Sequence, residues 1–311
     1  MPIDPVTALA APPAVEEIAW DVADVLLYHL ALGAGADPVD PGELRYATES
    51  GSVVLPTFAV VAPMLRATRP PSVSYPGVEV DLRTILHGSQ RIELHAPIPR
   101  EGKATTRSRV ADLYDKGSAA VIVVDTEATG ADGTPLWTSS MRMFSRGEGG
   151  FGGHRGPAGP PDPPAREPDH TVLTPTLPQQ ALWYRLLGDR NPLHADPEVA
   201  KAAGFPRPIL HGLCSYGLVC RAIVDEVLGG RAESVRSFEA RFAGVVFPGE
   251  TLRTSVWRAG DRLLFAATVE ERDGAPALAG GELVLAGEGL AGAGRADGAG
   301  RADGASREGT A

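Results

Sequence analysis

Residues 208–224, PILHGLCSYGLVCRAIV, decide the fold of this chain. Apolar and small residues cover nearly every face of the helix that this stretch predicts, and Arg221 is the one charge that interrupts them. A helix that is apolar on nearly all faces is buried. The sequence around it is rich in strand patterns, so we expect an antiparallel sheet wrapped around this helix.

The strand pattern occurs twice along the chain. In the first half the β-rich segments are RIELHAPIP (91–99), TTRSRVADLYD (105–115), AAVIVVDTEAT (119–129) and, after the turn DGTP (132–135), LWTSSMRMF. In the second half they are SFEARFAGVVFP (237–248), TLRTSVWRAGD, RLLFAATVEER (262–272) and, after the turn DGAP (273–276), ALAGGELVLA. Asp-Gly between such runs is a hairpin signal. Without strand–helix alternation, the pattern predicts an α+β chain with two antiparallel sheets, each on a central helix.

Helical patterns precede each set of strands. VEEIAWDVADVLLYHLALG (15–33) carries apolar residues at helical spacing and stops at Gly33, and LPQQALWYRLLG has the same spacing in the second half. GEGGFGGHRGPAGPPDPPAREPD (147–169) predicts a linker stiffened by its prolines. The sequence thus predicts repeats over 15–146 and 170–286. Residues 1–14 and the GAGRAD-rich tail over 287–311 are expected to be disordered.

Composition excludes several classes of function. The chain has 311 residues and a formal net charge of −10, which argues against general binding to nucleic acid or to anionic lipid. It contains no run long enough for a membrane span and no signal peptide pattern. Cys214 and Cys220 lie about 120° apart around one helix, so they cannot pair, and two unpaired thiols predict a reducing, cytoplasmic location.

The loop GDRNPLHADP, residues 188–197, places a carboxylate at Asp189 and an imidazole at His194. Pro192 biases Asn191 toward extended geometry, so that a short loop could turn both side chains inward, and the amide of Asn191 can fix the aspartate or the turn. A lone Asp-x-Asn-Pro-x-x-His is more often a capped turn than a catalytic pair. Asp196 is expected only to cap a short helix that ends near Gly204.

The run YRLLGDRNPLHADPEVAKAAGFPRPILHGLCSYG, residues 184–217, resembles the signature of the MaoC-like, or type-2 (R-specific), enoyl-CoA hydratases. LPTFAVV (55–61), ILHGSQRIELHAPIP (85–99), DLYDKGSAAVIVVD (112–125) and FGG (151–153) resemble the two-hot-dog members, as in the hydratase part of peroxisomal multifunctional enzymes. The resemblance implies a double hot-dog fold and hydration of a trans-2-enoyl-CoA to a (3R)-3-hydroxyacyl-CoA, or the reverse dehydration.

The resemblance also implies site residues. Asp189 and His194 would be the catalytic dyad, with Asn191 in support, and the sequence does not say which of the two takes the proton from water. The N–H of Gly212, in the first turn of the buried helix, would stabilise the thioester oxygen, whereas His211 is expected to be structural. A glycine without Cβ lets a ligand approach that N–H closely, although it could also serve only a tight turn.

Contacts to the coenzyme A arm are likewise implied by the resemblance. They fall on His87, Gly88, Lys116, Arg190 and Phe242. Taken alone, Lys116 is as often a solvated turn lysine, His87 is more often a packed histidine, and Phe242 is almost always a core residue. Lys116 could meet a phosphate as a point charge.

The first half lacks a GDxNPxH block, so we expect it to be non-catalytic. The resemblance to the two-hot-dog hydratases implies that this half binds the acyl chain, that its central helix is reduced, and that one active site lies between the halves. No metal motif and no nucleotide loop occurs, so no metal and no cofactor is expected beyond the coenzyme A thioester as substrate. A homodimer is compatible with the sequence. The alternatives are a dehydratase of carrier-protein-bound acyl chains and a silent module that binds acyl thioesters.

Overall fold

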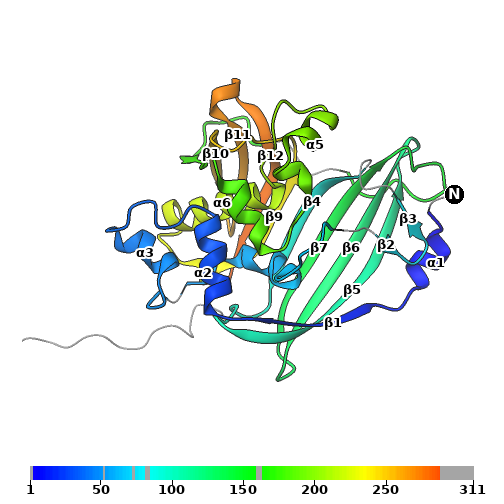
Figure 1. The fold of residues 1–311 in the computed structure, drawn as a ribbon, viewed down its shortest axis with the longest axis horizontal. Coiled ribbons are helices and arrows are strands. Elements are labelled where there is room, and N and C mark those ends of the chain that lie inside the picture. The colour runs from blue at the N-terminus through cyan, green and yellow to red at the C-terminus, as the bar shows by residue number, and fades with distance from the viewer. Residues whose placement is uncertain (1–2, 52, 72–73, 81–84, 159–162, 288–311) are drawn as a thin grey trace, which may run out of the picture.

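The computed structural model describes residues 3–51, 53–71, 74–80, 85–158 and 163–287. Ten strands form one antiparallel sheet in the order β1-β5-β6-β7-β4-β9-β12-β11-β10-β8 (Figure 1). The strands of the N-terminal half are β1 (Ala14–Trp20), β4 (Ile85–Leu94), β5 (Gly102–Asp115), β6 (Ala119–Gly130) and β7 (Pro135–Arg146). Those of the C-terminal half are β8 (His170–Pro175), β9 (Val235–Phe242), β10 (Thr251–Ala259), β11 (Arg262–Val269) and β12 (Ala275–Leu285).

The two expected sheet repeats are present, and they are joined edge to edge. Residues 89–93 of β4 pair with residues 237–241 of β9, so the sheet passes from one half to the other without a break. The two Asp-Gly turns connect β6 to β7 and β11 to β12, as the hairpin signal predicts. At the second turn Asp273 and Gly274 both have positive φ, the geometry for which Asp-Gly is suited.

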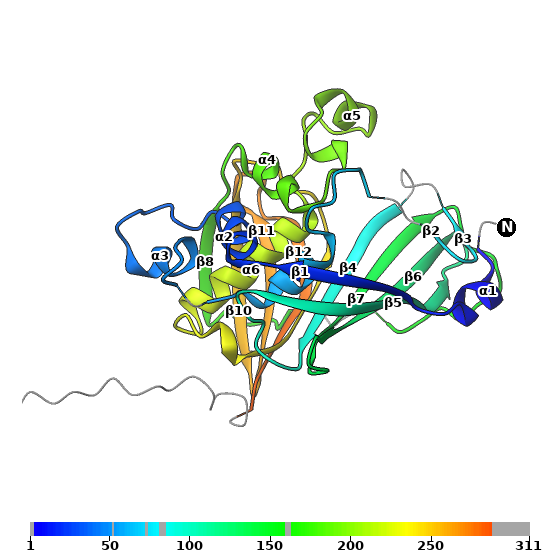
Figure 2. The same cartoon turned by 60° about the horizontal axis from the view of Figure 1, so that its bottom comes forward.

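Helix α6 (Gly212–Glu226) is the buried helix of the C-terminal half, as its sequence predicts. It packs on the inner side of the C-terminal strands and is crossed by α2 (Val22–Ala31) from the N-terminal half (Figure 2). The crossing is close, because a Cβ on Gly217 would lie 2.7 Å from the hydroxyl of Tyr28 and 2.9 Å from Leu32. Cys214 and Cys220 are buried free thiols, so the expectation that they do not pair is confirmed.

The N-terminal half has a much shorter central element. Two 3₁₀ turns, η1 (Pro56–Val60) and η2 (Ala62–Met64), occupy the place that α6 has in the other half, and all five residues of η1 are buried. The hydroxyl of Tyr28 donates a 2.8 Å hydrogen bond to Thr57, which fixes η1 against α2. The expected reduction of the first central helix is therefore present.

The helix expected over residues 15–33 is correct only in its second part. Residues 14–20 are the edge strand β1, paired with β5, and α2 begins at Val22 after a capping box made by Asp21 and Asp24. The segment VEEIAW fits both the spacing of an amphipathic helix and the alternation of a strand. Pairing with β5 decides for a strand because it buries Ile18 and Trp20 on one face.

The N-terminus is ordered where the structure describes it, which corrects the expectation of disorder over residues 1–14. Helix α1 (Pro5–Ala10) is capped by Asp4, and Ile3 forms a bridge with Val78 of β3 (Val78–Glu79), the partner of β2 (Ser74–Tyr75). Ile3 and Ala8 cover a second apolar cluster on β5 and β6. Burial of these side chains supplies the stabilisation that the composition of the segment does not suggest.

The remaining helices are short. They are α3 (Pro41–Ala47), α4 (Gln180–Tyr184), η4 (Arg185–Leu187), η5 (Pro192–His194), α5 (Pro197–Ala202), η6 (Ala232–Ser234) and η7 (Glu270–Arg272). Asp196 caps α5 as expected. The described parts of the connecting segment 147–169 contain no helix or strand, and the predicted tail lies outside the described residues except for Gly287. No described helix is long and apolar enough to cross a membrane.

Candidate active site

The loop that carries Asp189 is fixed by the glycine before it. Gly188 has φ of 120°, a conformation that side chains rarely adopt, and a Cβ there would lie 1.9 Å from the carbonyl oxygen of Met64. Only glycine allows this approach between the loop and η2 of the other half. Gly188 therefore sets the position of Asp189, a role for which the sequence gives no signal.

Two successive side-chain caps shape the loop. The carboxylate of Asp189 accepts a 3.1 Å hydrogen bond from the N–H of Asn191, whose amide oxygen accepts one of 3.1 Å from the N–H of Leu193. Asn191 has φ of −56° and ψ of 121°, the extended geometry that Pro192 favours. The amide of Asn191 was expected to fix either Asp189 or the turn, and it fixes the turn.

His194 lies at the end of η5 with a defined tautomer. Its Nδ1 is 2.9 Å from the carbonyl oxygen of Ile209, which can only accept, so Nδ1 carries the hydrogen and Nε2 keeps its lone pair. The ring is buried. Burial lowers the pKa of His194, and the negative charge of Asp189 opposes part of that shift. His194 is thus a neutral imidazole whose basic nitrogen is Nε2, and one of its ring nitrogens lies within 4.8 Å of a carboxylate oxygen of Asp189.

His211 completes this cluster. Its ring stacks on that of His194, with centroids 3.7 Å apart and planes at 27°. Its Nε2 lies 3.3 Å from the carbonyl oxygen of Asp189, to which it donates. Burial, reinforced by the neighbouring His194, places the pKa of His211 well below the ordinary value. The expected structural role fits, since His211 touches both the backbone of Asp189 and the ring of His194.

The three side chains are close enough to raise the question of a metal ion. One ligand atom each from Asp189, His194 and His211 lies within 4.8 Å of the others. In stacked imidazoles the lone pairs lie in two nearly parallel planes and do not converge on one point, whereas an ion needs converging ligands. The donor set therefore suits proton transfer better than metal binding.

Gly212 follows His211 directly and begins α6. Its N–H belongs to the first turn, where a helix has no acceptor of its own, and it makes no hydrogen bond with another described residue. A Cβ on Gly212 would lie 3.0 Å from the ring of Phe242. The glycine thus lets the aromatic ring pack against the helix start while the N–H stays available.

Phe242 connects this centre to the seam between the halves. Its ring lies 4.6 Å, centroid to centroid, from that of His87 in β4. Next to His87, Gly88 forms a bulge in the pairing of β4 with β7, just beyond the last pair of β4 with β9. Burial lowers the pKa of the His87 imidazole to about 4, although the residue as a whole is only half-buried. His87 is therefore neutral in ordinary buffers.

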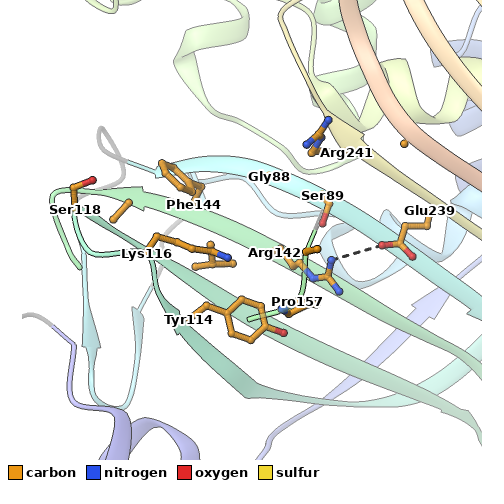
Figure 3. Close-up of a pocket in the computed structure, with 14 residues that line it drawn as sticks. Gly88, Ser89, Tyr114, Lys116, Ser118, Arg142, Phe144, Pro157, Glu239 and Arg241 are labelled. Carbon is orange, nitrogen blue, oxygen red and sulfur yellow. Dashed lines mark ion pairs between the residues drawn. The ribbon is translucent and has the colours of Figure 1, made fainter. Parts of the chain in front are cut away.

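A cavity of about 520 Å³ opens where β4 and β9 separate (Figure 3). Gly88, Lys116 and Arg142 line it from the N-terminal half, and Glu239 and Arg241 from the C-terminal half. Lys116 and Tyr114 lie on one side of the pocket and Arg241 on the other (Figure 3). The lining is cationic overall, since Arg142 lies 3.8 Å from Glu239 while no described carboxylate pairs with Lys116 or Arg241.

The structure thus brings most of the expected residues into two adjacent groups. Asp189, Asn191, His194 and Gly212 form the centre, and Gly88 and Lys116 line the cavity. Phe242 and His87 lie between the two groups. Arg190 is different, because its Nε donates a 3.2 Å hydrogen bond to the carbonyl oxygen of Ala67 and the residue does not line the cavity. Arg142 and Arg241 were missed, since an outward-pointing arginine on a strand gives no sequence signal.

Both halves of the chain match known protein families. Residues 160–277 match the model of the MaoC like domain, and residues 19–147 match the MFE-2 hydratase 2 N-terminal domain. The chain is 53% identical over 286 residues to Enoyl-CoA hydratase ChsH3 of Mycobacterium tuberculosis, covering 92% of this chain and 100% of that protein. It is 39% identical to the peroxisomal Enoyl-CoA hydratase 2 of Arabidopsis thaliana, covering 80% and 85%.

A solved structure agrees with the fold. The crystal structure of a MaoC-like dehydratase from Phytophthora capsici superposes with a TM-score of 0.83 at 32% identity, covering 93% of this chain and 100% of that one. Both halves and the seam between them therefore have counterparts in a solved protein.

Proposed function

Because the chain belongs to the MaoC-like family of type-2 enoyl-CoA hydratases and is a hydro-lyase, we propose that it adds water to a trans-2-enoyl-CoA to give a (3R)-3-hydroxyacyl-CoA, reversibly. The observation that carries this proposal is the neutral His194. Its Nδ1 donates to the carbonyl oxygen of Ile209, which leaves Nε2 as the basic nitrogen, and one of its ring nitrogens lies within 4.8 Å of a carboxylate oxygen of Asp189. Its ring stacks on His211, and the N–H of the next residue, Gly212, makes no hydrogen bond with another described residue.

The proposed reaction uses these groups in one proton cycle. Nε2 of His194 takes a proton from water as the water oxygen bonds to C3, and the electron pair of the double bond moves toward the thioester oxygen. The N–H of Gly212 stabilises the negative charge that gathers on that oxygen. Asp189 stabilises the imidazolium that forms, and the dyad then returns a proton to C2. The dyad ends in the protonation state in which it began.

The coenzyme A arm is proposed to run from Gly212 past Phe242 and His87 into the cavity at the seam. A volume of about 520 Å³ falls in the range of small-molecule sites. Lys116 and Arg241 supply positive charge for phosphate groups. This route favours a coenzyme A thioester over a carrier-protein thioester, whose arm carries no nucleotide to fill the cavity. Coenzyme A is substrate in this proposal, and no further cofactor is needed.

We also propose a cytoplasmic location for the protein and a homodimer as its assembly. Two buried free thiols fit a reducing compartment, so the cytoplasm stays our proposal. A homodimer of chains is a prediction that light scattering checks.

The dyad assignment is tested by hydration of a trans-2-enoyl-CoA, followed as loss of the absorbance of the conjugated thioester. Asp189→Asn and His194→Gln each keep the size of the side chain and remove its proton chemistry. We expect each to lower kcat by about 10³-fold or more. A chiral separation of the product should give the (3R) alcohol. Turnover like that of the unmodified protein in both variants would end the assignment, and binding without turnover in the unmodified protein would indicate the silent module.

A further inference from the structure

The connecting segment between the halves does more than join them. Its first part, residues 150–158, here named the strap, lies against the loop between β5 and β6 and ends at Pro157 and Ala158, which line the cavity. Figure 3 shows Pro157 next to Tyr114 on the lower side of the pocket. The strap is therefore one wall of the proposed coenzyme A site.

Asp115 holds the start of the strap. Its carboxylate accepts hydrogen bonds from the N–H groups of Gly150 at 2.9 Å and Gly152 at 2.8 Å, besides one from Gly117 in its own turn at 2.7 Å. The N–H of Asp115 donates a 2.9 Å bond to the carbonyl oxygen of His154. These donors lower the pKa of Asp115 to about 2, so the carboxylate is ionised at any working pH.

The middle of the strap is fixed by three more contacts. The imidazole of His154 lies 3.0 Å from the carboxylate of Asp112, and the ammonium of Lys116 donates to the carbonyl oxygen of Arg155. Gly156 packs on the ring of Tyr114 so closely that a Cβ would lie 2.4 Å from it. A segment that only spans two domains would not need so many specific contacts with one strand end.

Lys116 thus has two neighbours, the strap and the cavity. Its ammonium lies 5.7 Å from the centroid of the Tyr114 ring and touches the strap carbonyl, so the strap sets where this charge is placed in the pocket. A lysine ammonium is a point charge on a flexible stem, so the contact with the strap holds this charge in one place for a phosphate. Displacing the strap would therefore remove one wall of the cavity and also move the ammonium of Lys116 from its place.

Building on the proposed function, we propose that the strap completes the subsite for the nucleotide end of coenzyme A, with Asp115 as its positioning residue. The strap then makes the enzyme select coenzyme A thioesters over thioesters that end at pantetheine. The catalytic centre lies on the other side of Phe242 and His87, so loss of the strap should leave the chemical step unchanged.

The test compares two thioesters of the same acyl group, an enoyl-CoA and the corresponding enoyl-pantetheine. In Asp115→Ala we expect KM for the enoyl-CoA to rise about tenfold and kcat to stay within about twofold of that of the unmodified protein. The reason is that the variant loses only binding energy that is equal in the ground state and in the transition state. kcat/KM for enoyl-pantetheine should stay within about twofold. Asp132→Ala is the matched control, since Asp132 caps the β6–β7 turn in the same way but does not line the cavity.

Pro157→Glu keeps the test valid if Asp115→Ala does not fold. Pro157 is exposed, and a carboxylate there should repel phosphate and raise KM for the enoyl-CoA selectively. Equal losses for both thioesters in these variants overturn the strap proposal. Calorimetric titration with free coenzyme A separates this outcome from a failed hydratase assignment. If the protein hydrates neither thioester, weaker binding of coenzyme A to Asp115→Ala still supports the strap, and unchanged binding contradicts it.

Discussion

At the scale of residues, the site depends on one histidine being neutral and correctly oriented. Ile209 fixes the tautomer of His194, and stacking on His211 fixes its ring. The imidazole can accept a proton only in its neutral form. Burial favours that form, and the nearby carboxylate of Asp189 stabilises the charge once it develops.

The first prediction at this scale concerns pH. Burial lowers the pKa of His194 below the ordinary imidazole value of about 6.5. kcat/KM should therefore be flat near neutral pH and fall only below about pH 6.5, as His194 in the free enzyme takes up a proton. Initial rates from pH 5 to about 9 check this. His170→Gln, at a half-buried histidine in β8 that is not part of the catalytic centre, should not move the acidic limb. A limb that begins above pH 7 in the unmodified protein would contradict the assignment.

Much of the centre could be predicted from sequence because it is local. Asp189, Asn191 and His194 lie within six positions, and their loop is shaped by Pro192 and side-chain caps that act within two residues. Gly188 could not be predicted, since its constraint comes from Met64 in the other half. Contacts of that kind join residues that are distant in sequence, and a pattern of residue types does not record them.

At the scale of elements, α6 positions the site. Its N-terminus supplies Gly212, and its length is covered on nearly all sides by strands and by α2. The sequence predicted this helix well, because burial requires apolar residues on every face. It predicted the region over 15–20 poorly, because a short edge strand with alternating residues resembles the start of an amphipathic helix.

The prediction at this scale is a change in stability. Gly217→Ala would place a methyl group 2.7 Å from the hydroxyl of Tyr28 in α2. Since overpacking forces neighbouring side chains away, we expect a loss of about 1–3 kcal/mol in the free energy of unfolding. Denaturant titration measures it. Gly287→Ala, at a position with open space, is the control and should change little, and equal stability of both variants would contradict the close packing of α2 on α6.

At the scale of the whole molecule, the two halves act as one unit. They share a continuous sheet, and α3 is bound to α6 by ionic contacts that include Arg221 with Glu43 at 2.6 Å. The hydroxyl of Tyr46 also donates a 2.6 Å hydrogen bond to Asp225. The sequence indicated two similar halves, but the pairing of β4 with β9 and the strap contacts arise only when the halves meet.

The prediction at this scale is loss of stability in acid. His29 is buried in the N-terminal half, with Nδ1 donating to the carbonyl oxygen of Tyr46 and Nε2 accepting from the N–H of Leu55. Burial lowers its pKa to about 4. Above about pH 6.5 neither the folded nor the unfolded state is protonated at His29. As the pH falls toward 4, only the unfolded state takes up the proton, and roughly 3 kcal/mol of stability is lost.

Denaturant unfolding at about pH 7 and at about pH 4.5 measures the loss, because these values bracket most of this window. His29→Gln does not titrate, so the difference between the two pH values should be smaller in this variant than in the unmodified protein. An equal difference in both proteins would show that His29 is already protonated in the fold or is not buried.

The central claim is that Asp189 and His194 move one proton as a unit. Its most direct test is kcat for enoyl-CoA hydration in Asp189→Asn, in His194→Gln and in the protein with both changes. When two residues act as one unit, removing either one already removes most of their joint effect. kcat of the double variant should therefore be within about threefold of kcat of the slower single variant. A double variant whose loss equals the product of the two single losses would show independent roles and contradict the account.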